Sequence, residues 1–344
     1  MDLAKVIIDL SNASGPSGFE TPVAEMACKL MAPYVDETYI DVMGNAIGVK
    51  RCGIENAPKV LLDAHLDEIG FIITYIEKDG FLKYSTIGGV DPRMMPAACV
   101  KLLTEPPIYG VIDTMPPHAL SAEDAEKSLG QDELAIDVGL SEEECRNKIP
   151  LGTPAVYAAE CVRFGSDMIC GKALDDRACF AILVKAAELL SEEKLNCDVY
   201  IMGSTQEEVG LRGAKTGAFA LDPDYGIIVD VGHGKTPDSA DEVHHTVGGG
   251  AMIAIGPNMN RELTNTAIER AKEKGIKYQI EVEADGDSGT NTTVVQVTRE
   301  GVATVLFSLP LKYMHTPREV ISLSDAEAIA ALIAETVKTI GEEK

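Results

Sequence analysis

The sequence predicts an α/β fold that a small all-β segment interrupts, and three observations support this. In residues 1–70, amphipathic helices are followed by short apolar strands. Between residues 71 and 163, short β-like runs separated by Gly and Pro replace that pattern. From residue 164 to residue 344, strands and helices alternate again. We therefore expect one discontinuous domain, 1–70 with 164–344, and one inserted β-rich domain, 71–163.

The composition is that of a large acidic protein. Of its 344 residues 45% are hydrophobic, which is enough for two cores. The 55 acidic and 30 basic residues give a net charge of -25, which argues against nucleic acid or an anionic membrane as a partner. The eight cysteines form no C-x-x-C pair and indicate reduced thiols. No leader and no bilayer-spanning apolar run are evident, so we expect a cytoplasmic protein.

The segment before the insertion predicts two helices and three strands. Apolar spacing predicts helices at 3–12 and 20–32, joined by a turn-rich loop. Residues 39–49 predict a hairpin, and residues 59–64 predict a buried strand. This last strand carries the chain to its first candidates for chemistry.

His65 and Asp67 follow directly after that strand. Residues two apart in an extended segment point the same way, so the imidazole and the carboxylate share a face. One of them can bind a metal ion while the other orients it. A buried histidine that a nearby acid stabilises is the simpler interpretation of an isolated H-x-D.

The insertion offers few candidates for chemistry. It consists of short β-like runs broken by Asp-Gly, Gly-Gly and Pro-Pro pairs. A helix with an acidic first turn follows near its end. The expected strands are residues 71–76, 81–87, 100–103 and 109–112, and the expected helix is 141–147.

After the insertion, strands and helices alternate to the end of the chain. The terminal helix is expected to begin at Ser324, with Glu327 at the capping-box position. The expected helices are residues 178–190, 213–220, 261–274 and 324–340, and the expected strands are 197–203, 225–229, 251–255, 278–282 and 302–306.

Two adjacent acids, Glu207 and Glu208, follow the strand at 197–203. A buried strand rarely ends in paired carboxylates unless a positive charge compensates them. A divalent cation would do so, with one Glu as its ligand and the other holding the attacking water. The alternative is that both are solvated acids in the first turn of a helix, where the helix dipole favours them.

Similar residues follow other predicted elements. Asp175 and Asp176 precede the helix at 178–190, where an N-cap explains one aspartate better than two. In open α/β sheets, ligands bind beyond the carboxyl ends of strands. Carboxylate and imidazole without thiolate suit a catalytic pair of zinc, cobalt or manganese ions. The candidate set is His65, Asp67, Asp175, Glu207, Glu208, Asp230 and His315.

Five motifs, in this order, resemble those of the tetrahedral (TET) aminopeptidases. This family is also called the glutamyl aminopeptidases, and some of its members carry a cellulase or endoglucanase label. The resemblance covers nearly the whole chain. The motifs are AHLDEIG at 64–70, GKALDDR at 171–177, QEEVGLRGA at 206–214, VDV around Asp230, and YMHTPRE at 313–319.

This resemblance implies a fold and a function. The fold would be a mixed-sheet, zinc-peptidase-like domain with helices on both faces, and the insertion would be a PDZ-like dimerisation domain. The chain would remove single N-terminal residues from short peptides with two divalent ions, zinc or cobalt. Dimers would assemble into a tetrahedral dodecamer. The implied ligands are His65, Glu208, His315 and Asp230 with Asp175 bridging the ions, while Asp67 orients His65 and Glu207 is the general base.

Two departures from the family concern substrate preference. Residues 289–292 read GTNT where the family has G-T-D-A, and residues 310–313 read PLKY where it has P-x-R-Y. Both are expected near the substrate, so the preferred N-terminal residue stays open between acidic, aliphatic and basic. An acidic preference needs a local cation, for which Lys312, Lys235 and Arg261 are the candidates.

Two other functions compete with an aminopeptidase. A glycoside hydrolase needs two carboxylates separated across a sugar and commonly has aromatic platforms. Glu207 and Glu208 are consecutive, and the chain has no Trp and only 5% aromatic residues. A non-catalytic metal-binding scaffold would be expected to lack the general base, but Glu207 is present.

Overall fold

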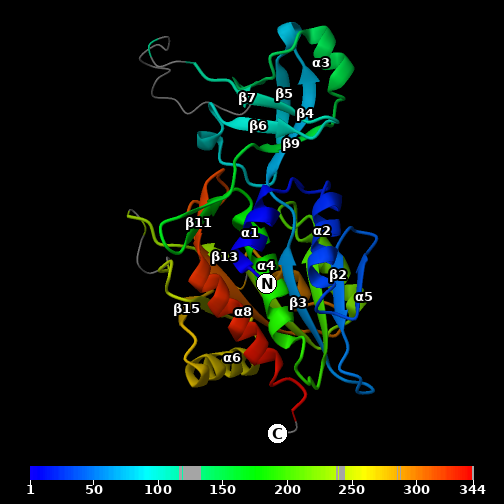
Figure 1. Ribbon diagram of the computed structural model, residues 1–344, viewed down its shortest axis with the longest axis vertical. Coiled ribbons are helices and arrows are strands. Elements are labelled where there is room, and N and C mark those ends of the chain that lie inside the picture. Colours follow the sequence, from blue (N-terminus) through cyan, green and yellow to red (C-terminus); the bar gives the residue numbers. More distant parts are fainter. Residues whose placement is uncertain are drawn as a thin grey trace.

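The computed structural model describes residues 1–115, 118, 133–237, 239, 245–284, 286 and 288–342, which form two parts (Figure 1). The larger part, here called the sheet region, holds an eight-stranded sheet, its helices and both ends of the chain. The smaller part is a closed barrel at one end of the molecule. Within the described residues, no helix is long and apolar enough to cross a bilayer. All eight cysteines are free thiols.

The sheet is mixed, as predicted. Its strand order is β1-β2-β12-β3-β13-β16-β14-β15. The four central strands β12, β3, β13 and β16 run parallel, whereas β1 and β2 pair antiparallel and β14 pairs antiparallel with β16. The strands are β1 (Glu37–Ile40), β2 (Ala46–Lys50), β3 (Lys59–His65), β12 (Asp198–Ser204), β13 (Tyr225–His233), β14 (Ala251–Ile255), β15 (Tyr278–Val282) and β16 (Ala303–Leu311).

Helices cover both faces of this sheet because its central strands are apolar on both sides. In β3, Val60 and Leu62 belong to one hydrophobic core and Leu61 to the other. The first core includes side chains of α1, α2, α4, α6 and α8, and the second includes those of α5 and α7. The helices are α1 (Leu3–Asn12), α2 (Thr21–Met31), α4 (Leu174–Leu190), α5 (Arg212–Leu221), α6 (Arg261–Lys274), α7 (Thr292–Val295) and α8 (Leu323–Val337).

The barrel has a separate core. Phe71 packs edge-on against both Tyr84 and Tyr157, with ring centroids 5.3 and 5.2 Å apart. Helix α3 (Glu142–Lys148) accompanies the strands, so this part is not purely β. The boundaries at residues 70 and 164 stay a prediction. The strands, in barrel order, are β4 (Gly70–Ile76), β5 (Leu82–Ile87), β8 (Ile136–Asp137), β7 (Ile108–Ile112), β6 (Cys99–Leu102) and β9 (Pro154–Tyr157).

A third, small sheet lies where the barrel leads back to the sheet region. It pairs β10 (Val162–Phe164), β11 (Met168–Gly171) and β17 (Glu319–Ser322). Helix α8 follows β17 directly and is capped by Ser322, whose hydroxyl accepts a hydrogen bond from the backbone N–H of Asp325. The prediction of a cap at Ser324 is therefore wrong, because the Ser324 hydroxyl donates to Asp167 instead.

Candidate metal centre

The parallel strands bring their carboxyl ends to the edge of the sheet that faces the barrel. His65 is the last residue of β3, and the pair Glu207 and Glu208 follows β12. His315 comes shortly after the end of β16. Asp230 does not close its strand, since β13 stays paired with β16 as far as His233. Each of these residues still reaches one shared cavity.

Two groups of three side chains have ligand atoms close enough to hold a metal ion. His65, Asp175 and Asp230 form one group, and Asp175, Glu208 and His315 form the other. In each group the ligand atoms lie within 4.8 Å of one another. Asp175 belongs to both: its Oδ1 lies 3.1 Å from Nε2 of His65, and its Oδ2 lies 3.3 Å from Nε2 of His315. One carboxylate therefore joins two potential cation sites.

Both imidazoles are held with Nε2 toward these carboxylates. Nδ1 of His65 lies 3.1 Å from the backbone oxygen of Asp67, and Nδ1 of His315 lies 2.9 Å from the backbone oxygen of Gly89. A carbonyl oxygen only accepts hydrogen bonds, so in each ring Nδ1 carries the hydrogen. When a metal ion is bound, each ring in its neutral form would present the lone pair of Nε2 to that ion.

Asp67 contacts the loop that carries the paired glutamates. Its Oδ1 accepts a hydrogen bond from the backbone N–H of Glu207 at 3.0 Å, and its Oδ2 accepts one from that of Glu208 at 3.1 Å. The hydroxyl of Ser17 also donates to Oδ2. Nδ1 of His65 lies farther from the Asp67 carboxylate, at 3.4 Å, than from the backbone oxygen of Asp67. The side chain of Asp67 thus fixes the glutamate loop as well as lying beside His65.

The two neighbouring glutamates face different groups. Oε1 of Glu208 lies 3.4 Å from Nε2 of His315 and belongs to the second group. Oε2 of Glu207 lies 3.8 Å from Nε2 of His65, and Glu207 belongs to neither group. The pair therefore contributes one potential ligand and one carboxylate that stands beside the potential ligands.

The electrostatics of the site show uncompensated negative charge. Burial, together with nearby carboxylates such as Asp175, raises the pKa of Glu207 to about 9 and that of Asp230 to about 8. Burial would lower the pKa of His315, but hydrogen bonds with Asp175 and Glu208 raise it to about 11. No Lys or Arg is among the described residues that line the cavity. The raised pKa values mean that these side chains hold protons when no divalent cation balances their charge. Their oxygen and nitrogen atoms are donors that such cations bind.

Glu319, which was not among the predicted site residues, supports both groups. It is buried, and its carboxylate accepts hydrogen bonds from the backbone N–H groups of Leu174, Asp175 and His315. Burial raises the pKa of Glu319 well above its ordinary value. An acid that opens an otherwise apolar strand, β17, was the available signal. Glu319 therefore fixes the backbone on both sides of the site.

The aspartates before the helix do not cap it. Helix α4 begins after Ala173, with no side-chain hydrogen bond at its cap. Asp175 and Asp176 both have non-helical backbone angles. Oδ2 of Asp176 accepts a hydrogen bond from the backbone N–H of His65, at 3.1 Å. The N-cap interpretation is thus wrong for both, because one faces the site and the other fixes the end of β3.

A turn of the barrel, Gly88-Gly89, completes the wall of the site. A Cβ added at Gly89 would lie 2.9 Å from Nδ1 of His315, and one added at Gly88 would lie 3.2 Å from the side chain of Glu208. Gly89 is also the residue whose carbonyl orients His315. Glycines let this backbone approach the metal-site side chains closely.

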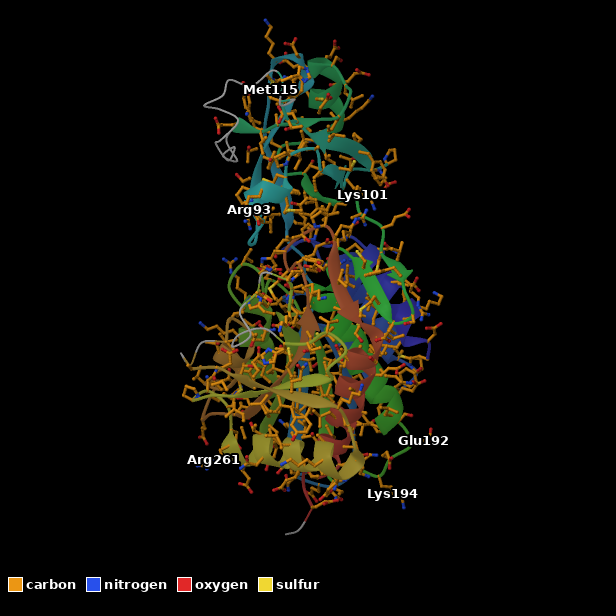
Figure 2. All side chains as sticks on the ribbon, turned by 90° about the vertical axis from the view of Figure 1, so that its left-hand side faces the viewer. Arg93, Lys101, Met115, Glu192, Lys194 and Arg261 are labelled. Atoms are coloured by element: carbon orange, nitrogen blue, oxygen red, sulfur yellow. The ribbon has the colours of Figure 1, made fainter. Side chains whose placement is uncertain are left out.

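The cavity over the site has a volume of about 670 Å³. Neither Asn291 nor Lys312 is among its described lining residues, although Gly289 and Thr290 of the first departing segment are. Asn291 is buried, and its amide donates to Oδ2 of Asp63 at 2.8 Å. Arg261 starts α6 at the end of the molecule far from the barrel (Figure 2). Lys235 is not a lining residue either, so none of the three proposed cations lines the cavity.

Known proteins are similar to this chain over nearly its whole length. A lysyl aminopeptidase of Pyrococcus furiosus is 35% identical over 331 residues, which are 95% of this chain and 93% of that protein. A TET1 peptidase of Pyrococcus horikoshii is 28% identical with a TM-score of 0.86, covering 98% of this chain and 100% of the other. An endoglucanase of Thermotoga maritima is 28% identical with a TM-score of 0.78, covering 96% of each chain.

A family description agrees with these individual likenesses. The M42 glutamyl aminopeptidase family matches residues 44–332, which include every candidate ligand of both groups. Peptidases of this family depend on metal ions, and the two groups supply the donor atoms that such ions need. The chain therefore belongs to the M42 glutamyl aminopeptidase family, as the resemblance of its five motifs to the TET aminopeptidases predicted.

Proposed function

We propose that this chain is an aminopeptidase that removes single N-terminal residues from short peptides with the help of two divalent ions, zinc or cobalt. The observation that carries the two-ion proposal is Asp175, which belongs to both three-residue groups. His65 and Asp230 would hold one ion with it, and Glu208 and His315 would hold the other. When bound, the ions would polarise the scissile carbonyl and lower the pKa of the attacking water.

Glu207 is the general base in this proposal. It stands beside His65 without belonging to either group, so its carboxylate is free to exchange protons. It takes the proton of the attacking water and returns it to the leaving amine. Asp67 positions Glu207 because its carboxylate accepts a hydrogen bond from the backbone N–H of Glu207. The backbone oxygen of Asp67 also orients the ring of His65. A base needs this positioning because proton transfer depends on hydrogen-bond geometry.

We also infer that the chain self-assembles. The similar TET1 peptidase of Pyrococcus horikoshii assembles into a tetrahedron or a large octahedral shell. On the barrel of this chain, Tyr75, Tyr109 and Val111 are large apolar residues that are exposed in the isolated chain. Tyr109 and Val111 are two apart on β7 and share one face, and exposed apolar neighbours of this kind support a contact surface. Such a surface fits dimers that build a tetrahedral dodecamer. Light scattering that finds a fully active monomer would contradict this assembly.

A glycoside hydrolase is the alternative, since one similar structure is an endoglucanase. The site disfavours it. Both glutamates of the consecutive pair reach one cluster of imidazoles and carboxylates, instead of flanking a sugar from opposite sides. Nor are any Phe, Tyr or Trp side chains among the described residues that line the cavity.

The test is a direct comparison of substrates. The full chain, loaded with Zn²⁺ or Co²⁺, is assayed on a panel of aminoacyl-4-nitroanilides and on carboxymethylcellulose. We expect turnover of the anilides only, its loss on chelation, and its return when metal is added back. Hydrolysis of the cellulose substrate alone would establish the glycosidase. A metal-loaded protein that cleaves neither would be the non-catalytic scaffold.

A further inference from the structure

The loop that carries the glutamate pair is held by side chains at four consecutive backbone N–H groups. It lies between β12 and α5, outside any helix or strand. The N–H groups of residues 205–208 donate in turn to Oδ1 of Asn45, to Oε1 of Glu20 and to the two carboxylate oxygens of Asp67, at 2.9, 3.0, 3.0 and 3.1 Å. Acceptors from three separate segments of the chain therefore fix the backbone of this loop.

Gln206 is the strained residue of the loop. Its φ of +54° lies in the left-handed region, which residues other than glycine rarely adopt. Such a conformation persists only where the surrounding contacts fix it. One of these contacts is the hydrogen bond from its N–H to Glu20, and the next residue is Glu207, the proposed general base. A change of backbone at Gln206 would therefore turn the peptide that leads into Glu207.

Glu20 stands at the N-cap position of α2, but its side chain does not cap that helix. A side chain at this position usually accepts a hydrogen bond from the second or third residue of the helix. Here Oε1 of Glu20 accepts from the N–H groups of Gly18 at 2.8 Å and Gln206 at 3.0 Å. The residue is only 5% exposed, and burial of a carboxylate is unfavourable unless hydrogen bonds stabilise it. Glu20 therefore serves the glutamate loop instead of its own helix.

The segment that ends in Glu20, residues 13–20, is itself anchored by buried charged groups. The buried guanidinium of Arg177 donates to the backbone oxygens of Ala13 and Gly15, at 2.6 and 3.1 Å. Glu68 pairs with Arg177 at 3.1 Å and also accepts a hydrogen bond from the N–H of Gly15 at 3.0 Å. Because buried charges hold this segment, it gives Glu20 a fixed support.

We propose that Glu20 is a positioning residue for the general base, because its bond to Gln206 fixes the backbone from which Glu207 reaches the attacking water. This inference rests on the proposed aminopeptidase function. Asp67 holds the same backbone at the next N–H, and neither bond uses the carboxylate of Glu207. That carboxylate stays free to exchange protons. The rate depends on its placement, since an error of about 1 Å can lower a rate by about 100-fold.

This role concerns the base and not the metal ions. Both hydrogen bonds of Glu20 end on backbone N–H groups of residues that are not candidate ligands, and Glu208 keeps its own bond to Asp67. Loss of the Glu20 carboxylate should therefore lower kcat and leave the metal content and KM near their wild-type values. A residue that only stabilises the fold would instead change the urea midpoint and leave kcat of the folded, metal-loaded protein unchanged.

The experiment measures kcat, KM, metal content and urea midpoint of the full chain loaded with Zn²⁺ or Co²⁺. The substrate is the aminoacyl-4-nitroanilide that the wild type cleaves fastest. Glu20→Ala removes both hydrogen bonds, and we expect kcat to fall by about 10- to 100-fold with two ions still bound. Glu25→Ala, which changes an exposed acid of α2, is the matched control and should leave kcat unchanged.

Two further variants separate the hydrogen bonds from the charge. Both bonds of Glu20 end on the same oxygen, so the amide oxygen of Glu20→Gln can accept both, and this variant should keep most of kcat. Glu20→Asp keeps the charge but is one methylene shorter, so it should lose the bond to Gln206 and more of kcat than Glu20→Gln. This order also decides the question if Glu20→Ala does not fold.

Each other result contradicts the proposal. If Glu20→Asp keeps more of kcat than Glu20→Gln, the charge of Glu20 matters and its bond to Gln206 does not. If Glu20→Ala is folded with two ions and its kcat is within about twofold of the wild type, Glu20 does not position the base. If Glu20→Ala loses an ion, Glu20 supports metal binding instead. If the metal-loaded wild type cleaves no anilide, the aminopeptidase function fails and this inference fails with it.

Discussion

The sheet region buries many charged side chains, whereas the described part of the barrel buries none. Among the described residues of the barrel, Thr153 is the one buried polar side chain apart from tyrosine and cysteine. The sheet region buries many acids, most of them at or below the edge that faces the barrel. They are Asp63, Asp67, Glu68, Asp175, Asp176, Asp230, Glu319 and Asp325, with Glu20 in the loop before α2.

This difference suggests that the sheet region supplies the reactive side chains and that the barrel helps to position them. Burying an acid costs free energy unless a cation or hydrogen bonds stabilise it. Glu68 illustrates the compensated case, because Lys172 and Arg177 pair with it at 2.7 and 3.1 Å. At the candidate site, no Lys or Arg is among the described residues that line the cavity. The proposed metal ions would therefore supply the positive charge there. The barrel contributes backbone to this site, through the Gly88-Gly89 turn.

The largest expected effect is in the sheet region and tests whether Glu207 is the general base and Glu208 a metal ligand. Glu207→Gln keeps the size of the side chain but removes its basicity, so we expect kcat to fall by about 10²- to 10⁴-fold. Both ions and substrate binding should be retained. Glu208→Gln should instead weaken metal binding, and added metal should partly restore activity. Metal content and single-turnover kinetics check both variants, and the opposite pattern would mean that the two roles are reversed.

A smaller effect is expected from a substitution in the barrel. Gly89→Ala places a methyl group 2.9 Å from Nδ1 of His315 and should move that ring away from the second group. We expect a loss of about 10- to 100-fold in metal affinity, the usual effect of altering a residue that orients a ligand. Glu143→Ala, an exposed residue of α3 on the same barrel, is the control. Equal metal affinities for the two variants would show that the barrel does not position His315.

The third effect is on stability instead of activity, and it concerns a buried acid that is not a candidate ligand. Burial raises the pKa of Asp63 from 3.8 to about 7. Since this folded pKa lies above the unfolded one, the group's contribution to stability is complete below about pH 4 and is lost as the pH rises through 7. The free energy of unfolding of the wild type should therefore fall relative to Asp63→Asn by roughly 2 to 4 kcal/mol over this range. Urea midpoints at pH 4 to 8 measure it, and a constant difference would contradict it.

The sequence was sufficient for most of the fold of the sheet region. Apolar runs that parallel strands bury on both faces predicted β3, β12 and β13. The cap of α8 was placed two residues late, because Ser322 and Ser324 are both acceptable N-cap residues and the end of strand β17 at Ser322 decides between them. Asp230 was placed at a strand end because the extra pairing of β13 with β16 leaves no local signal.

The candidate ligands were found because acids and histidines after apolar strands are unusual and local in sequence. Glu319 and Gly89 were missed because their roles come from residues far away in the chain. Gly89 meets His315 only when the barrel folds against the sheet region. Glu319 meets the backbone of Leu174 and Asp175 only when β17 pairs with β11. Contacts between residues so far apart in the chain leave no local sequence pattern that would predict them.

The central claim is that Asp175 joins two cation sites at the carboxyl edge of the sheet. The most direct test is the metal content of the purified chain after saturation with Zn²⁺ or Co²⁺ and removal of free ions, measured by elemental analysis. We expect two ions per chain for the wild type and the weakening of both sites together in Asp175→Asn, since the two groups share this residue. A wild type that is fully active with no more than one ion per chain would contradict it.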